Sequence, residues 1–260
     1  MITALWRRRS LFLGFLRREL ATRYVGTLGG ALWALVHPVL LLAIYAFVFR
    51  LVFRVQLPDL GGNSYVTVVA CALWPWMAFQ EAVQRGTMAV VNNADLVRKV
   101  AFPRELLVMA AVASSFIVHL AGFAVVVLAL SLWGENLYLS ALPLVLAGWV
   151  VLAALALALA LLSAGMQVVL KDVDHMLGLV LMLGFYATPV LYPMSMVPEA
   201  FAPWMGLNPL VHALEPMRAA LLQGQWQPVP LLGLALLALL LLGVGRWVFA
   251  RLSRRFEDFL

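Results

Sequence analysis

The sequence predicts an all-α integral membrane protein with six transmembrane helices. Of its 260 residues, 65% are hydrophobic and only 12% are charged, whereas soluble domains are about half apolar and about a quarter charged. A transmembrane helix needs roughly 20 apolar residues, and six uncharged runs are at least that long. None of them alternates as the strands of a membrane barrel do. The runs span residues 24–49, 60–80, 106–134, 136–170, 175–198 and 219–245.

The basic residues predict the orientation of the chain. If both termini are cytoplasmic, the inner segments carry every Lys and Arg except Arg50, Arg54 and Arg218. Because cytoplasmic loops are enriched in Lys and Arg, this arrangement is the expected one. The formal net charge of +6 is therefore loop charge and not the signature of a nucleic-acid-binding protein.

Residues 1–23 predict an amphipathic helix that lies on the inner membrane surface. Leu13, Leu16 and Leu20 fall on one helical face. The basic residues around them suit an anionic cytoplasmic leaflet. The alternative is that these charges only anchor the topology.

The first two spans are expected to be kinked and rich in aromatic residues. Residues 28–53 contain Pro38 directly after His37, and residues 64–83 contain Pro75. A proline removes one backbone donor and bends a helix. The aromatic side chains of these spans include Tyr45, Phe49, Trp74, Trp76 and Phe79.

The connector after the second span predicts a short amphipathic helix over residues 92–102. Asn92 or Asn93 is expected to cap this helix, and Pro103 to end it. Such a helix at the inner membrane edge is either a binding site for another protein or a solvated loop that fixes topology. Its apolar stripe is Leu96, Val97 and Val100, with Asp95, Arg98 and Lys99 beside it.

The third and fourth spans are predicted over residues 105–133 and 139–170. His119 lies near the middle of the third span, and no acidic residue follows or precedes it within a turn. We therefore expect a hydrogen-bonded packing role for His119 and not proton transfer. The charged turn at residues 171–175 could hold a metal, but its mixed charge favours a solvated turn or a second partner contact.

The last part of the chain contains two spans and a long segment between them. The fifth span is expected over residues 176–192, and it ends with Phe185, Tyr186 and Tyr192. The segment at 193–230 is apolar but rich in proline, which suggests short helices that dip back into the membrane. A helix is expected from Asn208 to Gly224 with an interruption at Pro216. The sixth span covers residues 231–249.

The sequence lacks the motifs of an ATPase or a hydrolase. Its two lysines, Lys99 and Lys171, do not follow a glycine, so no GxxxxGK loop exists. Neither HExxH nor GxSxG occurs. Cys71 is the single cysteine, which excludes a CxxC metal site. We therefore expect no catalytic site, no metal site and no cofactor in this chain; if it pumps, another chain supplies the energy.

Four segments resemble one family of membrane proteins. They are RRELATRYVGTLGGALWALVHP (17–38), NNADLVRKVAFPREL (92–106), KDVDHMLGLVLMLGFYATPVLYP (171–193) and LNPLVHALEPMRAALLQG (207–224). Their order and spacing resemble the membrane subunit of the type-II ABC exporters that move O-antigen, capsule and teichoic-acid polysaccharides. His37 departs from this pattern, since asparagine is more usual before Pro38.

The resemblance implies an architecture and a set of partners. Residues 1–260 would form one transmembrane domain in the bacterial inner membrane, as a homodimer with two copies of a nucleotide-binding ATPase that holds ATP and Mg. Residues 92–102 would be the coupling helix and residues 194–224 an outer re-entrant gate. The first and fifth spans of both copies would line the channel. The residues expected to contact the ATPase are Asp95, Leu96, Arg98, Lys99, Val100, Lys171 and Asp172.

The implied substrate is a glycan on a polyprenyl pyrophosphate lipid. Arg17, Arg18 and Arg23 lie where the pyrophosphate would approach, because arginine pairs with phosphate in bidentate fashion; plain headgroup anchoring is the alternative. Aromatic rings stack on the apolar faces of sugars, although an interfacial aromatic belt would use the same residues. The channel candidates are Tyr45, Phe49, Trp74, Trp76, Phe79, Phe185, Tyr186 and Tyr192.

A secondary transporter or channel is the rival class. It would need intramembrane charges for ion coupling, and the spans offer little besides Glu81 and His119.

Overall fold

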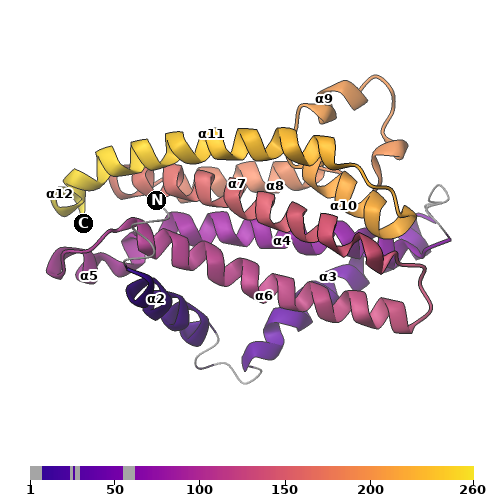
Figure 1. The fold of residues 1–260 in the computed structure, drawn as a ribbon, viewed down its shortest axis with the longest axis horizontal. Helices are drawn as coiled ribbons and strands as arrows, with labels where there is room; N and C mark the ends of the chain where they lie inside the picture. Colours follow the sequence, from indigo (N-terminus) through magenta and orange to yellow (C-terminus); the bar gives the residue numbers. More distant parts are fainter. Residues whose placement is uncertain (1–7, 24–25, 27–29, 55–61) are drawn as a thin grey trace.

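The computed structural model describes residues 8–23, 26, 30–54 and 62–260. Every regular element in this part of the chain is a helix, which confirms the all-α class. The long helices run side by side in one elongated bundle (Figure 1). Within the described ranges, five helical segments are long and apolar enough to cross a membrane. They are Trp33–Val52 (α3, Trp33–Ala46, with η2, Phe47–Val52), Tyr65–Met88 (α4), Glu105–Leu132 (α6), Leu139–Val169 (η4, Leu139–Ala141, with α7, Leu142–Val169) and Pro228–Arg255 (α11, Pro228–Leu252, with η6, Ser253–Arg255).

Helix α4 is the centre of the bundle. Helices α6 and α7 pack along it, and α10 (Val211–Gln223) packs against both α4 and α7. In α4, 78% of the most apolar stretch is buried, compared with 11% in the α3 segment and 22% in the α11 segment. Side chains of α4 therefore form the interior, whereas α3 and α11 leave wide apolar faces at the periphery.

Small residues allow close contact between the helices. A Cβ atom on Gly245 of α11 would lie 2.5 Å from the carbonyl oxygen of Ala158 in α7. Such contacts are typical of membrane helices, which lack a hydrophobic driving force for association and depend on close packing. A buried hydrogen bond of 2.6 Å between the hydroxyl groups of Thr87 and Ser163 also joins α4 to α7.

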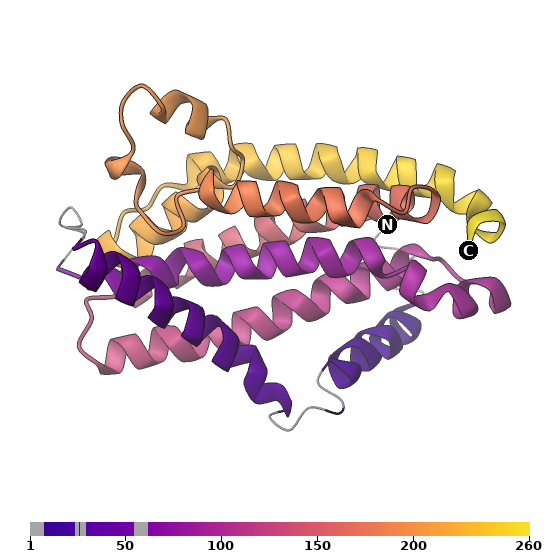
Figure 2. The ribbon, with the colours of Figure 1, turned by 180° about the vertical axis from the view of Figure 1, so that it is seen from behind.

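The segment before α4 agrees with the predicted first span. The last six residues of the span, Phe47–Val52, form a π-helix. Figure 2 shows α3 inclined to the other helices, so that its end approaches α4 while its beginning diverges. Helix α2 (Arg9–Thr22) packs against α6 near one end of the bundle, and η1 (Gly30–Leu32) leads into α3. Residues 1–7 of the predicted interface helix and residues 55–61 of the predicted turn lie outside the described residues.

The predicted end of the fifth span at Tyr192 is wrong. Helix α8 covers Val173–Tyr186, and its 14 residues span only about 21 Å at 1.5 Å per residue, less than the roughly 30 Å of a bilayer core. Pro189 explains the early end, because proline cannot continue the hydrogen-bond ladder and disfavours a helical residue before it. Asn208 donates to the carbonyl oxygen of Ala187 and to the hydroxyl of Thr188, which holds the turn.

The segment between α8 and α11 contains short helices and no interruption at Pro216. Helices η5 (Met194–Met196) and α9 (Ala202–Gly206) precede α10, which continues through Pro216 to Gly224, whose φ is +66°. Pro216 has no N–H group and so removes one hydrogen bond within α10, but the helix continues through it. Arg218 in α10 is fully buried and donates to the carbonyl oxygens of Pro189, Val190 and Tyr192. This contact fixes the turn after α8 to α10.

Glu135 joins the beginning of α4 to the turn after α6. Its carboxylate accepts a hydrogen bond of 2.9 Å from the backbone N–H of Ser64. Partial burial alone would raise the pKa of Glu135, but hydrogen bonds from Ser64 and Thr67 and the charge of Arg50 hold that pKa below its ordinary value. The charged form of Glu135 therefore stabilises this end of the bundle.

The two ends of the bundle differ in charge. Helices α2, α5 (Ala94–Lys99, preceded by η3, Val91–Asn93) and α12 (Phe256–Phe259) lie toward one end, and α9 and α10 lie toward the other (Figures 1 and 2). Arg104 donates to the carbonyl oxygen of Ser253, which places the basic C-terminal segment beside the start of α6. The basic residues predicted for the inner side thus gather at the α5 end.

Candidate functional site

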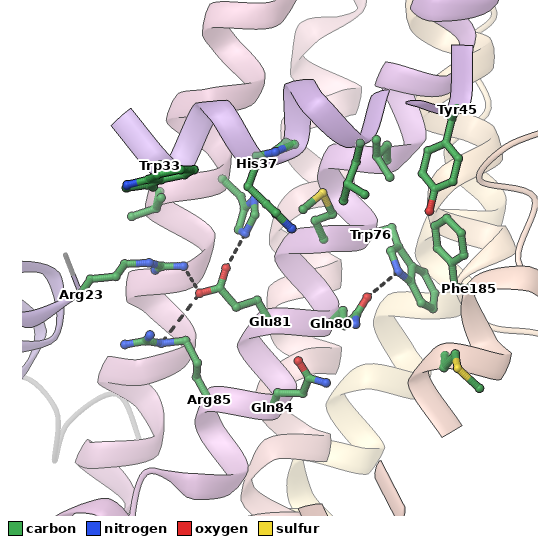
Figure 3. Close-up of a pocket in the computed structure, with 18 of the residues that line it drawn as sticks. Arg23, Trp33, His37, Tyr45, Trp76, Gln80, Glu81, Gln84, Arg85 and Phe185 are labelled. Atoms are coloured by element: carbon green, nitrogen blue, oxygen red, sulfur yellow. Dashed lines mark hydrogen bonds and ion pairs between the residues drawn. The ribbon is translucent and has the colours of Figure 1, made fainter. Parts of the chain in front are cut away.

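A cavity of about 620 Å³ lies between α3, α4, α6 and α8. Ligand sites typically occupy 300–1,000 Å³. One end of this cavity is charged, with Arg23, Glu81 and Arg85, and the other is aromatic, with Tyr45, Trp76, Phe185 and Tyr186 (Figure 3). Its lining therefore contains cationic groups that can bind an anion and aromatic rings that can stack on the apolar face of a ligand.

Glu81 is the centre of the charged end. Its carboxylate accepts hydrogen bonds from Arg23 and lies 2.6 Å from Nε2 of His119 and 3.9 Å from Nε of Arg85. Arg85 also donates to Glu19 of α2 at 2.9 Å. The Arg23 side chain is only 4% exposed. Because a charge at membrane depth is costly unless it is paired, this cluster makes the buried arginine tolerable and joins the end of α2 to α4 and α6.

His119 has an acidic partner that the sequence does not indicate. Glu81 is 38 residues earlier in the chain, and it reaches His119 only because α4 and α6 pack together. The Nδ1 atom of His119 is buried without a hydrogen-bond partner among the described residues. The sequence neighbours of His119 within one helical turn therefore do not include its acidic partner.

The aromatic end brings together four of the eight predicted channel residues. The rings of Tyr45 and Phe185 stack with centroids 5.9 Å apart. The ring centroids of Trp76 and Tyr186 lie 5.7 and 5.3 Å from that of Phe185. Tyr186 remains 63% exposed. These rings come from α3, α4 and α8, so the contact surface depends on all three helices.

The other four predicted channel residues lie elsewhere. Trp74 is fully buried against Gly122 of α6 and does not line the cavity. Phe79 is buried and packs on Trp76. Phe49 stacks on Tyr65, and Tyr192 donates to the carbonyl oxygen of Tyr186 at 2.8 Å.

The three arginines predicted to bind pyrophosphate are dispersed. Arg17 is exposed on α2, and Arg18 donates to Asn93 at the start of α5. Of the three, only Arg23 lines the cavity, where it and Arg85 both approach Oε1 of Glu81 (Figure 3). Sequence reasoning did not select Arg85, although its position four residues after Glu81 indicated a shared helical face.

Helix α5 presents charged side chains at its end of the bundle. Asp95, Arg98, Lys99 and Val100 are exposed. Leu96 and Val97 instead pack against the core, so the apolar stripe attaches α5 to its own chain.

The predicted asparagine cap of α5 is wrong. Asn93 occupies the N-cap position, but its side chain makes no cap hydrogen bond. The Asn93 amide donates back to the carbonyl oxygen of Ala89 at 2.8 Å, and its oxygen accepts from Arg18. The contact with α2 thus replaces the cap.

The charged turn before α8 lies near α5. Lys171 and Asp172 are exposed, and a cavity of about 710 Å³ extends from Asn92 to His175. Gln167 holds the turn by accepting from the backbone N–H of Asp174 and donating to the carbonyl oxygen of Lys171. The two predicted contact segments therefore belong to one end of the molecule.

Comparison with known proteins identifies the relatives of this chain. Residues 10–222 match the ABC-2 type transporter family. The chain is 28% identical over 246 residues to the O-antigen export system permease protein RfbA of Klebsiella pneumoniae, covering 94% of this chain and 92% of the relative. It is 29% identical to RfbA of Myxococcus xanthus, covering 99% and 97%. It is 23% identical to the polysialic acid transport protein KpsM of Escherichia coli, covering 88% of each.

Proposed function

Because the chain belongs to the ABC-2 type transporter family, we propose that it is the non-catalytic membrane subunit of an ATP-driven polysaccharide exporter. Its substrate is a lipid-linked, O-antigen-like glycan, which it moves across the bacterial inner membrane. The observation that carries this proposal is the match over nearly the full chain to two O-antigen export permeases. The match to a polysialic acid transporter is weaker, so capsule and teichoic acid are the alternative cargoes of the same architecture.

The α5 end of the bundle supports docking of a separate ATPase that binds ATP and Mg. The exposed residues of α5 and of the turn at 171–175 lie toward the same end of the bundle and carry both signs of charge. This end is attached firmly to the rest of the chain, because Phe15 of α2 packs on Phe102 with centroids 5.3 Å apart and Arg18 bonds to Asn93. Closure of the ATPase would therefore move α2, α5 and the start of α6 together. With the ATPase in the cytoplasm, both termini of the chain are cytoplasmic.

A homodimer would complete the channel. Helices α3 and α8 bury few of their apolar side chains in one chain, namely Pro38, Leu42 and Leu181. They also carry Tyr45, Phe185 and Tyr186 at the aromatic end of the cavity. A second copy facing these helices would enclose an aromatic passage between them, in which weak and repeated contacts let a polymer move. Residues 194–224 would close its outer end.

The charged end of the cavity supports recognition of the lipid pyrophosphate. Arg23 and Arg85 share Glu81, and an incoming pyrophosphate would compete with that carboxylate for the same guanidinium groups. Charge-assisted bonds to phosphate are about twice as strong as neutral ones. Arg17 and Arg18 on α2 would attract the lipid headgroup before it reaches the cavity.

The docking surface is tested by a charge reversal. In the variant Arg98→Glu/Lys99→Glu, we expect export and substrate-stimulated ATP hydrolysis to be abolished, because repulsion replaces attraction at the cleft of the ATPase. Export of surface glycan and co-purification of the ATPase with the membrane subunit are measured. The matched control is Arg254→Glu/Arg255→Glu, which reverses two exposed charges at the same end outside α5.

Membrane insertion of both double variants should equal that of the wild-type chain. If the α5 variant exports glycan and retains its ATPase normally, α5 is not the coupling element and the assignment fails.

A further inference from the structure

Two cavities form one continuous groove along α4. The cavity of about 620 Å³ and the cavity of about 710 Å³ share Gln84, Arg85 and Met182 in their linings. The combined groove extends from Asp174 and His175, at the α5 end, to the aromatic cluster at Tyr45 and Phe185. It therefore links the end proposed to face the cytoplasm with the aromatic surface deeper in the bundle.

One face of α4 borders this groove with a row of polar groups. Trp76, Gln80 and Gln84 are spaced by four residues, so they lie on one side of the helix, and Figure 3 shows them in sequence along it. The indole N–H of Trp76 donates to the amide oxygen of Gln80 at 3.0 Å. That bond leaves the amide N–H groups of Gln80 available. The side chain of Gln84 makes no hydrogen bond within the described part of the chain.

A neighbouring row on α4 has a different character. Glu81 pairs with Arg23, Arg85 pairs with Glu19, and the charges of Glu81 and Arg85 lie 3.9 Å apart. The glutamines do not take part in this ionic cluster. Polar side chains within a membrane span are costly and usually mark a substrate path. Ion pairing explains the presence of Glu81 and Arg85 but not that of the two glutamines.

We infer that Gln80 and Gln84 are saccharide-binding residues, and that they form the first sugar subsites of the exporter. This inference rests on the proposed function. A primary amide offers two donors and an acceptor, which suits the hydroxyl groups of a sugar. The adjacent charged row, with Arg85, contacts the pyrophosphate, so the groove recognises a sugar that is joined to a phosphate.

The row also explains how a polymer advances. Successive sugar units meet equivalent amides four residues apart, about 6 Å along α4. Each contact is neutral and weak, since a single hydrogen bond contributes about 1 kcal/mol net. The glycan therefore exchanges one amide for the next without being trapped, before it reaches the aromatic rings.

The first test uses Gln80→Leu and Gln84→Leu in the full exporter with its ATPase. Each variant should lower export about five-fold, which corresponds to the loss of about 1 kcal/mol. Basal ATP hydrolysis and the amount of assembled complex should remain at wild-type levels. The matched control is Gln225→Leu, because Gln225 is exposed in the loop before α11 and lies outside the groove.

The second test detects the glycan at the residues themselves. Cys71 is buried, so Cys71→Ala provides a background for Gln80→Cys, Gln84→Cys and, as the control, Gln225→Cys. A membrane-permeant maleimide is added to cells that make the polymer and to cells in which polymer synthesis is blocked. The polymer should slow labelling at positions 80 and 84 several-fold and leave position 225 unchanged.

Equal labelling at positions 80 and 84 with and without polymer overturns the inference, as does normal export by both leucine variants. Either result would leave the exporter function intact. Failure of the function itself would appear differently, as a wild-type chain that retains no ATPase and whose loss does not affect glycan export.

Discussion

At the scale of single residues, the charged end of the cavity depends on Glu81. This carboxylate is shared by Arg23, Arg85 and His119, which come from the segment after α2, from α4 and from α6. Removal of one member of a buried ionic cluster leaves its partners unpaired, and the cost of that exceeds the net contribution of the bonds themselves. Energetic coupling between Glu81 and Arg23 is therefore expected.

The variant Glu81→Gln should destabilise the protein by about 1–3 kcal/mol, because buried guanidinium donors lose their charged acceptor. The double variant Arg23→Met/Glu81→Gln should be less destabilised than the sum of the two single variants. The thermal midpoint in detergent measures both. Glu199→Gln is the control, since Glu199 is exposed. Additive losses would show that the two side chains do not interact.

The aromatic residues yield a second prediction at this scale. Tyr45→Ala and Tyr186→Ala should reduce glycan export while basal ATP hydrolysis continues. The aromatic rings that the glycan contacts are lost, whereas the proposed ATPase is unchanged. Trp133→Ala tests the alternative of an interfacial belt, as Trp133 is 84% exposed at the end of α6. If all three variants lower export equally, the belt explains these residues better than a channel does.

At the scale of elements, the bundle depends on how closely α7 and α11 approach each other. Gly245 faces the backbone of Ala158, and a Cβ atom there would lie 2.5 Å from a carbonyl oxygen. Gly243, two residues earlier on the same helix, has no atom within 4 Å of the corresponding position. The two glycines therefore form a matched pair, of which one is required by packing and the other is not.

Gly245→Ala should lower the thermal midpoint, because α11 must move away from α7. Gly243→Ala should leave the midpoint unchanged or raise it, since alanine favours a helix over glycine by up to about 1 kcal/mol in water. Thermal unfolding of both variants in detergent is the measurement. A loss of stability in Gly243→Ala as large as that in Gly245→Ala would contradict the packing argument.

At the scale of the whole molecule, the distribution of charge determines the orientation that we propose. The basic residues of α2, α5 and the C-terminal segment gather at one end (Figure 1). Positive loops remain on the cytoplasmic side during insertion, and the proposed ATPase would also reach α5 from the cytoplasm. In this proposal, the same end therefore serves both topology and docking.

Cysteine labelling tests this orientation in the Cys71→Ala background. A membrane-impermeant thiol reagent added to spheroplasts should label Ser140→Cys and Ser195→Cys, which are exposed at the end opposite α5. It should label Asn92→Cys only after the membrane is disrupted. All three variants should react after solubilisation, which is the control for access. The opposite pattern would place α5 outside and leave it no ATPase to contact.

The sequence by itself determined the class of the protein, the positions of the long helices and the end at which the basic residues gather. These properties follow from apolar run length and from loop charge, which are local along the chain. The length of the apolar run predicts a span that ends at Tyr192, whereas α8 ends six residues earlier, at Tyr186, because Pro189 follows. Pro216 predicts an interruption that α10 does not have. The sequence does not show that Arg218 of α10 is bonded to the turn after α8.

Only the tertiary structure decided which side chains meet. Glu81 and His119 are far apart in the chain, and Trp74 and Trp76 are nearly adjacent, yet the first pair touches and only Trp76 of the second lines the cavity. The physical reason is helix geometry, since residues two apart on a helix face different directions, whereas the packing of α4 on α6 joins residues from separate spans. The groove along α4, with its glutamines, exists only after that packing.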